Sequence, residues 1–117
     1  LQVNIGELTT AVQENVNLVV ILMNSRDYEV IKNIQDATYG GRRHYSDIYA
    51  PDFEAIASGA GWSYQRLSDL GRASTVLGSA VQTQGPTMIE VDMAAIGSYA
   101  RAFGGPPVRV AEMSRGR

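Results

Sequence analysis

The sequence contains no cysteine, and this absence excludes several kinds of site at once. Disulfide bonds, thiolate nucleophiles and zinc or iron–sulfur centres held by cysteine all need a thiol. The single histidine, His44, therefore has no cysteine partner for a catalytic pair. Because it stands in a polar, glycine-containing segment, we interpret His44 as an ordinary loop residue.

The chain also lacks a long hydrophobic run and a surplus of positive charge. Its longest apolar run, Leu18 to Met23, is far shorter than the roughly 20 residues that span a bilayer. The net charge is -2 and the basic residues are scattered, so neither nucleic acid nor a membrane is an expected partner. The one basic pair, Arg42-Arg43, is interpreted as a solvated loop. Since Leu1-Gln2-Val3 does not resemble a secretory signal and cysteine is absent, a cytoplasmic location is expected.

What remains is typical of one folded domain: 117 residues, 44% hydrophobic and 19% charged. The run 18–23 is continuous rather than alternating, which predicts a strand covered on both faces, as in a parallel sheet. Two more short strands are expected at 62–67 and 87–91. Because helical patterns separate these strands, the sequence predicts an α/β fold with a parallel sheet flanked by helices.

The helices are expected from capping residues and apolar periodicity. Four helices are predicted. The first has about ten residues and is opened by a capping box of Asn4 and Glu7, and the second runs from Tyr28 to about Ala37. The third has Pro51 at its first position and ends at Gly59–Gly61, and the fourth is capped by Ser68 and carries Leu70, Ala73, Leu77 and Val81 on its apolar face. Beyond Asp92 the pattern becomes unclear, and 93–117 is interpreted as an extension or tail.

A candidate site follows the strand 18–23, because ligands of parallel sheets bind beyond the carboxyl ends of the strands. The segment 24–27, Asn-Ser-Arg-Asp, offers amide, hydroxyl and carbonyl oxygens, which are ligands suited to magnesium or calcium. The helix that follows would favour a diphosphate at its N-terminus. The plainer interpretation of these residues is helix capping. Gly59-Ala60-Gly61 lacks the third glycine of a dinucleotide fingerprint and is interpreted as a helix end.

Three segments, in the same order along the chain, resemble one known family. They are Asn4–Asn15 with Leu18–Asn24, Ala50–Ala57 (Ala-Pro-Asp-Phe-Glu-Ala-Ile-Ala), and Gly85–Val91 (Gly-Pro-Thr-Met-Ile-Glu-Val). Together they are similar to the C-terminal cofactor-binding domain of thiamine-diphosphate enzymes of the acetolactate synthase and benzoylformate decarboxylase type. The resemblance covers residues 1–92 and implies part of a three-layer α/β/α thiamine-diphosphate-binding domain.

The resemblance also implies which residues bind the cofactor and its Mg²⁺. In the family, the ion is held by an Asp of a Gly-Asp-Gly motif, the second Asn of an Asn-Asn pair, and a backbone carbonyl two residues later. Carried over, Asn24 takes the first Asn position, Ser25 the second, and Asp27 supplies the carbonyl. Tyr28 opens the helix that covers the cofactor. The predicted cofactor-binding residues are therefore Asn24, Ser25, Asp27 and Tyr28, with Ser25 and Asp27 as metal ligands.

Two departures from the family pattern bear on activity. Ser25 replaces the usual amide with a shorter and weaker ligand, and the Gly-Asp-Gly motif, expected just before Leu1, is missing. The family's activating Glu belongs to another domain, so no catalytic residue is predicted in this chain. The resemblance thus implies a fragment of a 2-oxo acid decarboxylase or carboligase, inactive alone. It would need the remainder of the enzyme and a second subunit.

Two other hypotheses stay open at the level of the sequence. One is a non-catalytic α/β assembly or binding module whose metal site has decayed, as Ser25 suggests. The other is an unrelated flavodoxin-like binding domain. An edge position for the strand 18–23, with residues 24–27 far from any phosphate-sized cleft, would favour the second of these.

Overall fold

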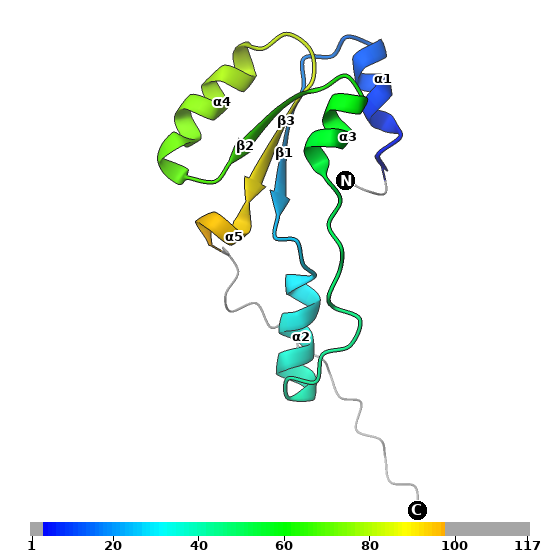
Figure 1. Ribbon diagram of the computed structural model, residues 1–117, viewed down its shortest axis with the longest axis vertical. Helices are drawn as coiled ribbons and strands as arrows, with labels where there is room; N and C mark the ends of the chain where they lie inside the picture. The colour runs from blue at the N-terminus through cyan, green and yellow to red at the C-terminus, as the bar shows by residue number, and fades with distance from the viewer. Residues whose placement is uncertain (1–3, 98–117) are drawn as a thin grey trace, which may run out of the picture.

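The computed structural model describes residues 4–97, which form a three-stranded parallel sheet with helices around it (Figure 1). The strands are β1 (Val19–Asn24), β2 (Ser63–Leu67) and β3 (Thr87–Asp92), and their order across the sheet is β1-β3-β2. Each of the two outer strands pairs in parallel with β3. The predicted fold class, a parallel sheet flanked by helices, is confirmed.

The central strand β3 is buried along its whole length. Its side chains point alternately to the two faces of the sheet. Met88 on one face and Ile89 on the other are both fully inaccessible to solvent. A strand with layers on both sides needs apolar residues at successive positions, which explains the adjacent Met88 and Ile89.

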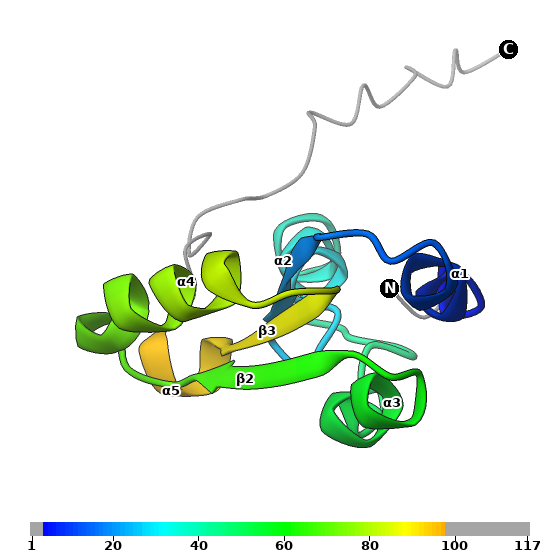
Figure 2. The same cartoon turned by 90° about the horizontal axis from the view of Figure 1, so that it is seen from above.

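Helices cover both faces, as Figure 2 shows, with α4 on one side and α1 and α3 on the other. The helices are α1 (Glu7–Gln13), α3 (Phe53–Gly59) and α4 (Ala73–Gln82). Two apolar clusters fill the spaces between the layers. The first consists of Leu8, Phe53, Ala57, Trp62 and Met88. The second consists of Leu67, Val76, Ala80, Ile89, Val91 and Met93.

The prediction that the strand 18–23 is covered on both faces is wrong for the described residues. Ile21 and Met23 each remain 50% exposed, and within residues 4–97 no strand pairs with the outer edge of β1. The reason lies in the helical layer on that face, because α4 packs mainly against β2 and β3. Apolar content alone predicted burial, whereas the position of the covering helix decides it.

The predicted helix starts at residues 4 and 51 are wrong. Helix α1 begins at Glu7 with Gly6 at its N-cap and no side-chain cap, so Asn4 forms no capping box and the helix has 7 residues. Helix α3 begins at Phe53, because the side chain of Asp52 accepts a hydrogen bond from the Ala55 N–H. An Asp carboxylate satisfies a free N–H of the first turn, and this places Pro51 before the helix rather than in it.

The predicted start and apolar face of the fourth helix are also wrong. Asp69, not Ser68, provides the cap, since it accepts from the Gly71 N–H and opens a 3₁₀ turn, η2 (Leu70–Arg72), before α4. The buried side chains of α4 are Val76 and Ala80, while Val81 is 75% exposed. Ala73 belongs to two overlapping apolar stripes at helical spacing, and only the 73, 76 and 80 stripe faces the sheet.

Helix α2 (Glu29–Tyr39) lies beyond the carboxyl end of β1 and has no fully buried residue (Figure 1). Tyr28 is its N-cap, and Gly40 ends it two residues later than predicted, with φ 61° in the left-handed region that favours glycine. A short helix that was not predicted, α5 (Met93–Ile96), follows β3. The expected extension 93–117 otherwise falls on residues 98–117, outside the described residues, and the boundary at residue 92 stays a prediction.

Candidate functional site

The turn between β1 and α2 begins at Asn24, a buried residue at the end of its strand. The Asn24 Oδ1 accepts a hydrogen bond of 2.9 Å from the Arg26 backbone N–H. Arg26 has φ 58°, in the left-handed region that a residue with a Cβ adopts at a cost. The side chain of Asn24 therefore replaces a backbone acceptor and stabilises a turn that the backbone alone disfavours.

The two predicted metal ligands meet inside this turn. The Ser25 hydroxyl donates a hydrogen bond to the backbone carbonyl of Asp27, with the two oxygen atoms 3.0 Å apart. The Tyr28 N–H donates to Asp27 Oδ1 at 2.7 Å, directly before the first residue of α2. The structure thus brings the predicted residues Asn24, Ser25, Asp27 and Tyr28 together along one turn.

All four of these residues line a cleft of about 310 Å³. Its other wall is formed by the segment that leads into α3, including Ile48, Pro51 and Phe53. Clefts of this size are at the lower end of those that hold small ligands. The strand 18–23 does lie at a sheet edge among the described residues, but residues 24–27 line a cleft large enough for a phosphate group rather than lying far from one.

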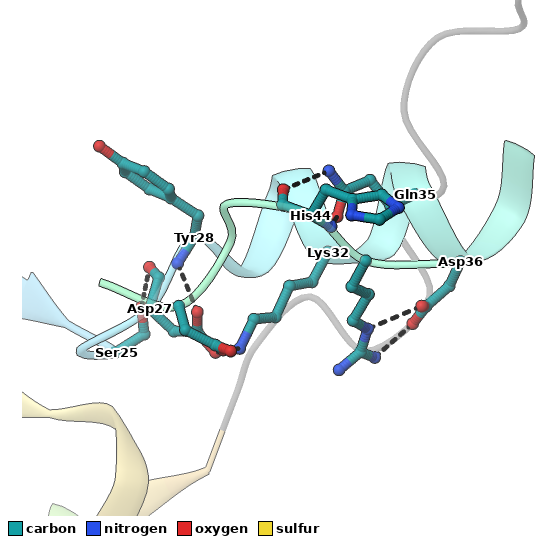
Figure 3. Close-up of polar contacts among 9 residues, drawn as sticks. Ser25, Asp27, Tyr28, Lys32, Gln35, Asp36 and His44 are labelled. Atoms are coloured by element: carbon teal, nitrogen blue, oxygen red, sulfur yellow. Dashed lines mark hydrogen bonds and ion pairs between the residues drawn. The ribbon is translucent and has the colours of Figure 1, made fainter. Parts of the chain in front are cut away.

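Lys32, the single lysine of the chain, links this turn to the segment after α2 (Figure 3). Its ammonium group lies 2.6 Å from Asp27 Oδ2 and 2.6 Å from Asp47 Oδ1. The hydrogen bonds with Asp27 and Asp47 raise the pKa of Lys32, and the same lysine lowers the pKa of Asp47. Because Asp27 already accepts from Tyr28, both oxygens of its carboxylate have partners.

Two further contacts hold the segment 42–47 against α2. Gln35 exchanges two hydrogen bonds with the backbone of His44, at 3.0 and 3.2 Å. Arg43 Nε donates to Asp36 Oδ1 at 2.8 Å, and this hydrogen bond is the largest influence that lowers the pKa of Asp36. His44 and the Arg42-Arg43 pair are exposed loop residues, as the sequence predicted. Figure 3 shows Lys32, Gln35 and Asp36 directed toward this segment from α2.

A buried carboxylate supports the turn from the middle of the sheet. Glu90 of β3 is 6% exposed, and its Oε1 accepts a hydrogen bond of 2.6 Å from the Asn24 side-chain amide. Its Oε2 accepts from the hydroxyl of Tyr64 on β2. Burial, together with the hydrogen bond to Glu90, raises the pKa of Tyr64. One side chain on β3 therefore contacts both neighbouring strands.

Asp92 ends the same strand and joins several elements. It accepts hydrogen bonds from the Arg66 guanidinium and from the N–H groups of Ala94 and Ala95, which start α5. The Arg26 guanidinium lies 3.5 Å from it. The hydrogen bond from Arg66 is the main influence that lowers the pKa of Asp92. Arg26 is thus held through both its backbone and its side chain.

Glu90, Asp92 and Tyr64 were not identified from the sequence, although a signal exists. Glu90 and Asp92 are two residues apart in a strand, so they point to the same face. Two acids at the carboxyl end of a buried strand indicate a polar edge, which is where a site is expected in a parallel sheet. Glu90 lines a second cleft of about 360 Å³ together with Arg26 and Arg66. Asp92 forms ion pairs with these two arginines.

The metal ligands that the turn offers are all oxygen atoms. Across residues 4–97 there is no group of three or more His, Cys, Asp and Glu side chains placed to hold a metal ion. The described turn offers a cation the Ser25 hydroxyl and the Asp27 carbonyl.

Among residues 4–97, no helix has the length and apolar character needed to cross a membrane.

Comparison with known proteins gives consistent matches. Residues 1–91 match the family described as "Thiamine pyrophosphate enzyme, C-terminal TPP binding domain". The chain is 32% identical over 85 residues to the mitochondrial acetolactate synthase catalytic subunit of Aspergillus candidus, covering 73% of this chain and 12% of that protein. It is 31% identical over 100 residues to the acetolactate synthase isozyme 3 large subunit of Escherichia coli K12, covering 84% of this chain and 17% of that protein. The chain therefore spans less than a fifth of the length of either relative.

Proposed function

Since the chain belongs to the thiamine pyrophosphate enzymes, whose C-terminal cofactor-binding domain it matches over residues 1–91, we propose that its β1–α2 turn holds the diphosphate end of thiamine diphosphate through Mg²⁺. The family membership excludes the unrelated flavodoxin-like domain. The similarity to acetolactate synthases supports an acetolactate-synthase-like parent enzyme.

The distance between Ser25 Oγ and the Asp27 carbonyl oxygen carries the proposal. Mg²⁺ prefers oxygen ligands in octahedral geometry at about 2.1 Å, so adjacent ligands are about 3.0 Å apart. Ser25 Oγ and the Asp27 carbonyl oxygen are 3.0 Å apart, and both residues line the cleft. They therefore fit two neighbouring positions around Mg²⁺. The remaining ligands would come from water, the diphosphate and residues outside 4–97.

The charges around the turn suit an anionic cofactor. Asp27 carries a negative side chain next to its own proposed metal-binding carbonyl, and Lys32 and the Tyr28 N–H occupy its two carboxylate oxygens. Lys32 is shared with Asp47, so it offsets part of the Asp27 charge and reduces the repulsion between Asp27 and a diphosphate. The N-terminal end of α2 adds a partial positive charge next to the cleft. The residues of this chain thus bind and orient, while the cofactor supplies the carbanion chemistry when it is bound.

The complete reaction belongs to the parent protein. We propose decarboxylation of a small 2-oxo acid followed by carboligation, in an assembly that includes the remainder of the enzyme and a second subunit. Because the chain spans 12% and 17% of two acetolactate synthases, and because the described residues offer two metal ligands, we expect the 117-residue chain to be inactive alone.

A second candidate function is a non-catalytic assembly module of the same family. One observation favours it: residue 25 is a serine, whose hydroxyl reaches less far than the amide that the family resemblance leads one to expect. In this case the fold and its exposed β1 side chains Ile21 and Met23 would serve contacts between subunits, and the turn would bind no metal.

Calorimetric titration of thiamine diphosphate separates the two functions. The full-length product of the gene that encodes this chain is titrated with and without Mg²⁺, and the 117-residue chain is tested beside it for turnover of pyruvate. We expect the full-length protein to bind the cofactor only with Mg²⁺. Ser25→Ala should weaken this binding, while Ser58→Ala, an exposed serine on α3, should not. Absence of any Mg²⁺-dependent binding would reject the enzymatic function and leave the assembly module.

A further inference from the structure

The carboxylate of Glu90 is buried beneath the β1–α2 turn but touches none of the proposed ligands. It is 6% exposed, and its two oxygens accept from the Asn24 amide and the Tyr64 hydroxyl. A buried carboxylate is costly unless it is hydrogen-bonded, so these two contacts hold it in one orientation. Its effect on the site must pass through a neighbouring side chain.

Asn24 provides that connection. An amide side chain has two ends with opposite hydrogen-bonding character, and either end can face a given partner. Here Nδ2 donates to Glu90 at 2.6 Å, which turns Oδ1 toward the Arg26 N–H at 2.9 Å. The reversed amide would place oxygen against a carboxylate and NH₂ against an N–H group. Glu90 therefore selects the amide orientation that the turn requires.

The turn depends on this selection because Arg26 has a disfavoured backbone. At φ 58° a residue with a Cβ costs about 1 kcal/mol or more relative to the common regions. The hydrogen bond from Arg26 N–H to Asn24 offsets that cost. Without it, the backbone between Ser25 and Asp27 would relax, and the 3.0 Å approach of the Ser25 hydroxyl to the Asp27 carbonyl would be lost.

We propose that Glu90 is the positioning residue of the 24–28 turn: acting through the Asn24 amide, it holds Arg26 in the left-handed conformation that brings the Ser25 hydroxyl and the Asp27 carbonyl together. The inference rests on the proposed function only in treating this turn as the cofactor-binding loop. Tyr64 has a supporting role, because its hydroxyl occupies the second oxygen of Glu90 and prevents the carboxylate from rotating away from Asn24.

Amide hydrogen exchange, followed by NMR on the 117-residue chain without metal or cofactor, tests this directly. In Glu90→Met the side chain keeps its length but loses both acceptors, and we expect the Arg26 amide to exchange at least about tenfold faster. In Glu90→Gln the side-chain carbonyl still accepts from Asn24, so exchange should stay within about threefold of the parent chain. Glu54→Met, an exposed glutamate on α3, is the matched control and should leave Arg26 unchanged.

A reversed pair keeps the test decisive if Glu90→Met does not fold. Asn24→Asp places two carboxylates together, and the Arg26 amide should then exchange about tenfold faster. The double variant Asn24→Asp with Glu90→Gln again pairs one donor with one acceptor, so it should recover the slow exchange of Arg26. Recovery in the double variant supports the proposal. The proposal is overturned if the Arg26 amide stays unprotected in the double variant or stays protected in Glu90→Met. It is also overturned if protection is lost equally at the β3 amides of Ile89 and Val91, as a purely structural role of Glu90 would give.

Loss of cofactor binding in the titration described above would reject the proposed function without altering these exchange rates. The two ideas can therefore fail separately. If both hold, Glu90→Met in the full-length protein should weaken Mg²⁺-dependent cofactor binding, and Glu90→Gln should largely preserve it.

Discussion

Replacing Thr87 by valine is expected to stabilise the fold. Thr87 is the first residue of β3, and its side chain is fully inaccessible to solvent. Within the described part of the chain, its hydroxyl oxygen has no hydrogen-bond partner. The backbone N–H of the same residue donates to the Leu18 carbonyl at 2.8 Å, and a valine retains that bond. Valine has nearly the shape of threonine, so the substitution changes one hydroxyl into a methyl group.

The magnitude follows from the burial and the missing partner. A buried polar group without a hydrogen bond costs about 1–3 kcal/mol, and a buried methyl group contributes roughly 0.8 kcal/mol through the hydrophobic effect. Because the hydroxyl can relax toward neighbouring carbonyl groups, we take the lower part of this range and expect a gain of about 1–2 kcal/mol. For a domain of this size, each kcal/mol raises Tm by about 4–8 °C.

Urea unfolding followed by the fluorescence of Trp62 measures the change. Trp62 is the single tryptophan of the chain and is buried between α1 and α3, so its emission reports loss of the core. The control is Thr83→Val, which removes a hydroxyl that does have a partner, the Ser79 carbonyl at 2.9 Å. This control should be neutral or mildly destabilising. If Thr87→Val lowers the free energy of unfolding, the Thr87 hydroxyl has a partner outside residues 4–97 or a bound water, and the reasoning is refuted.

Three further predictions concern the core, the pH response and the site. Trp62→Phe removes the buried hydrogen bond from Trp62 Nε1 to the Leu8 carbonyl at 2.7 Å and should lower the free energy of unfolding by about 2 kcal/mol. Amide exchange should rise most in α1, and an exchange rate in α1 equal to that of the parent chain would contradict this prediction. The pKa of Asp92 is lowered from its ordinary value of 3.8, mainly by Arg66, so its contribution to stability is present above about pH 4 and is lost as the pH falls further. Asp92→Asn should therefore flatten part of the acid limb in urea melts from pH 2.5 to 6, and an unchanged limb would count against it. Ser25→Asn in the full-length protein should strengthen Mg²⁺ binding by about 1 kcal/mol, roughly fivefold, in calorimetry with thiamine diphosphate present; unchanged affinity would remove Ser25 from the ligand set.

The sequence predicted those parts of the molecule that depend on local pattern. The apolar runs at 18–23 and 87–91 became β1 and β3, because continuous apolar residues suit a parallel sheet. The polar residues after the first run did come together beside a cleft, because strand ends and helix starts meet there. The local pattern also predicted α2 and α3, with first and last residues within two positions of those in the structure.

The parts that the sequence could not predict depend on competition or on distant contacts. Ser68 and Asp69 are both good caps, and only the three-dimensional fold selects Asp69. Two apolar stripes overlap on α4, and periodicity alone does not choose between them. The contact of Asn24 with Glu90 joins residues 66 positions apart, so no local motif could have indicated it.

Besides the hydrogen bond from the Ser25 hydroxyl to the Asp27 carbonyl, the β1–α2 turn has contacts that do not depend on the side chain at position 25. The turn is held by Asn24, by the left-handed Arg26 and by Glu90 on the central strand, and none of these contacts involves the Ser25 side chain. We therefore expect the departure from the family at Ser25 to leave these contacts in place and to change mainly the reach and strength of one ligand. For this reason Ser25→Asn is expected to strengthen metal binding without rebuilding the loop, whereas Glu90→Met, which alters no ligand, is expected to weaken it.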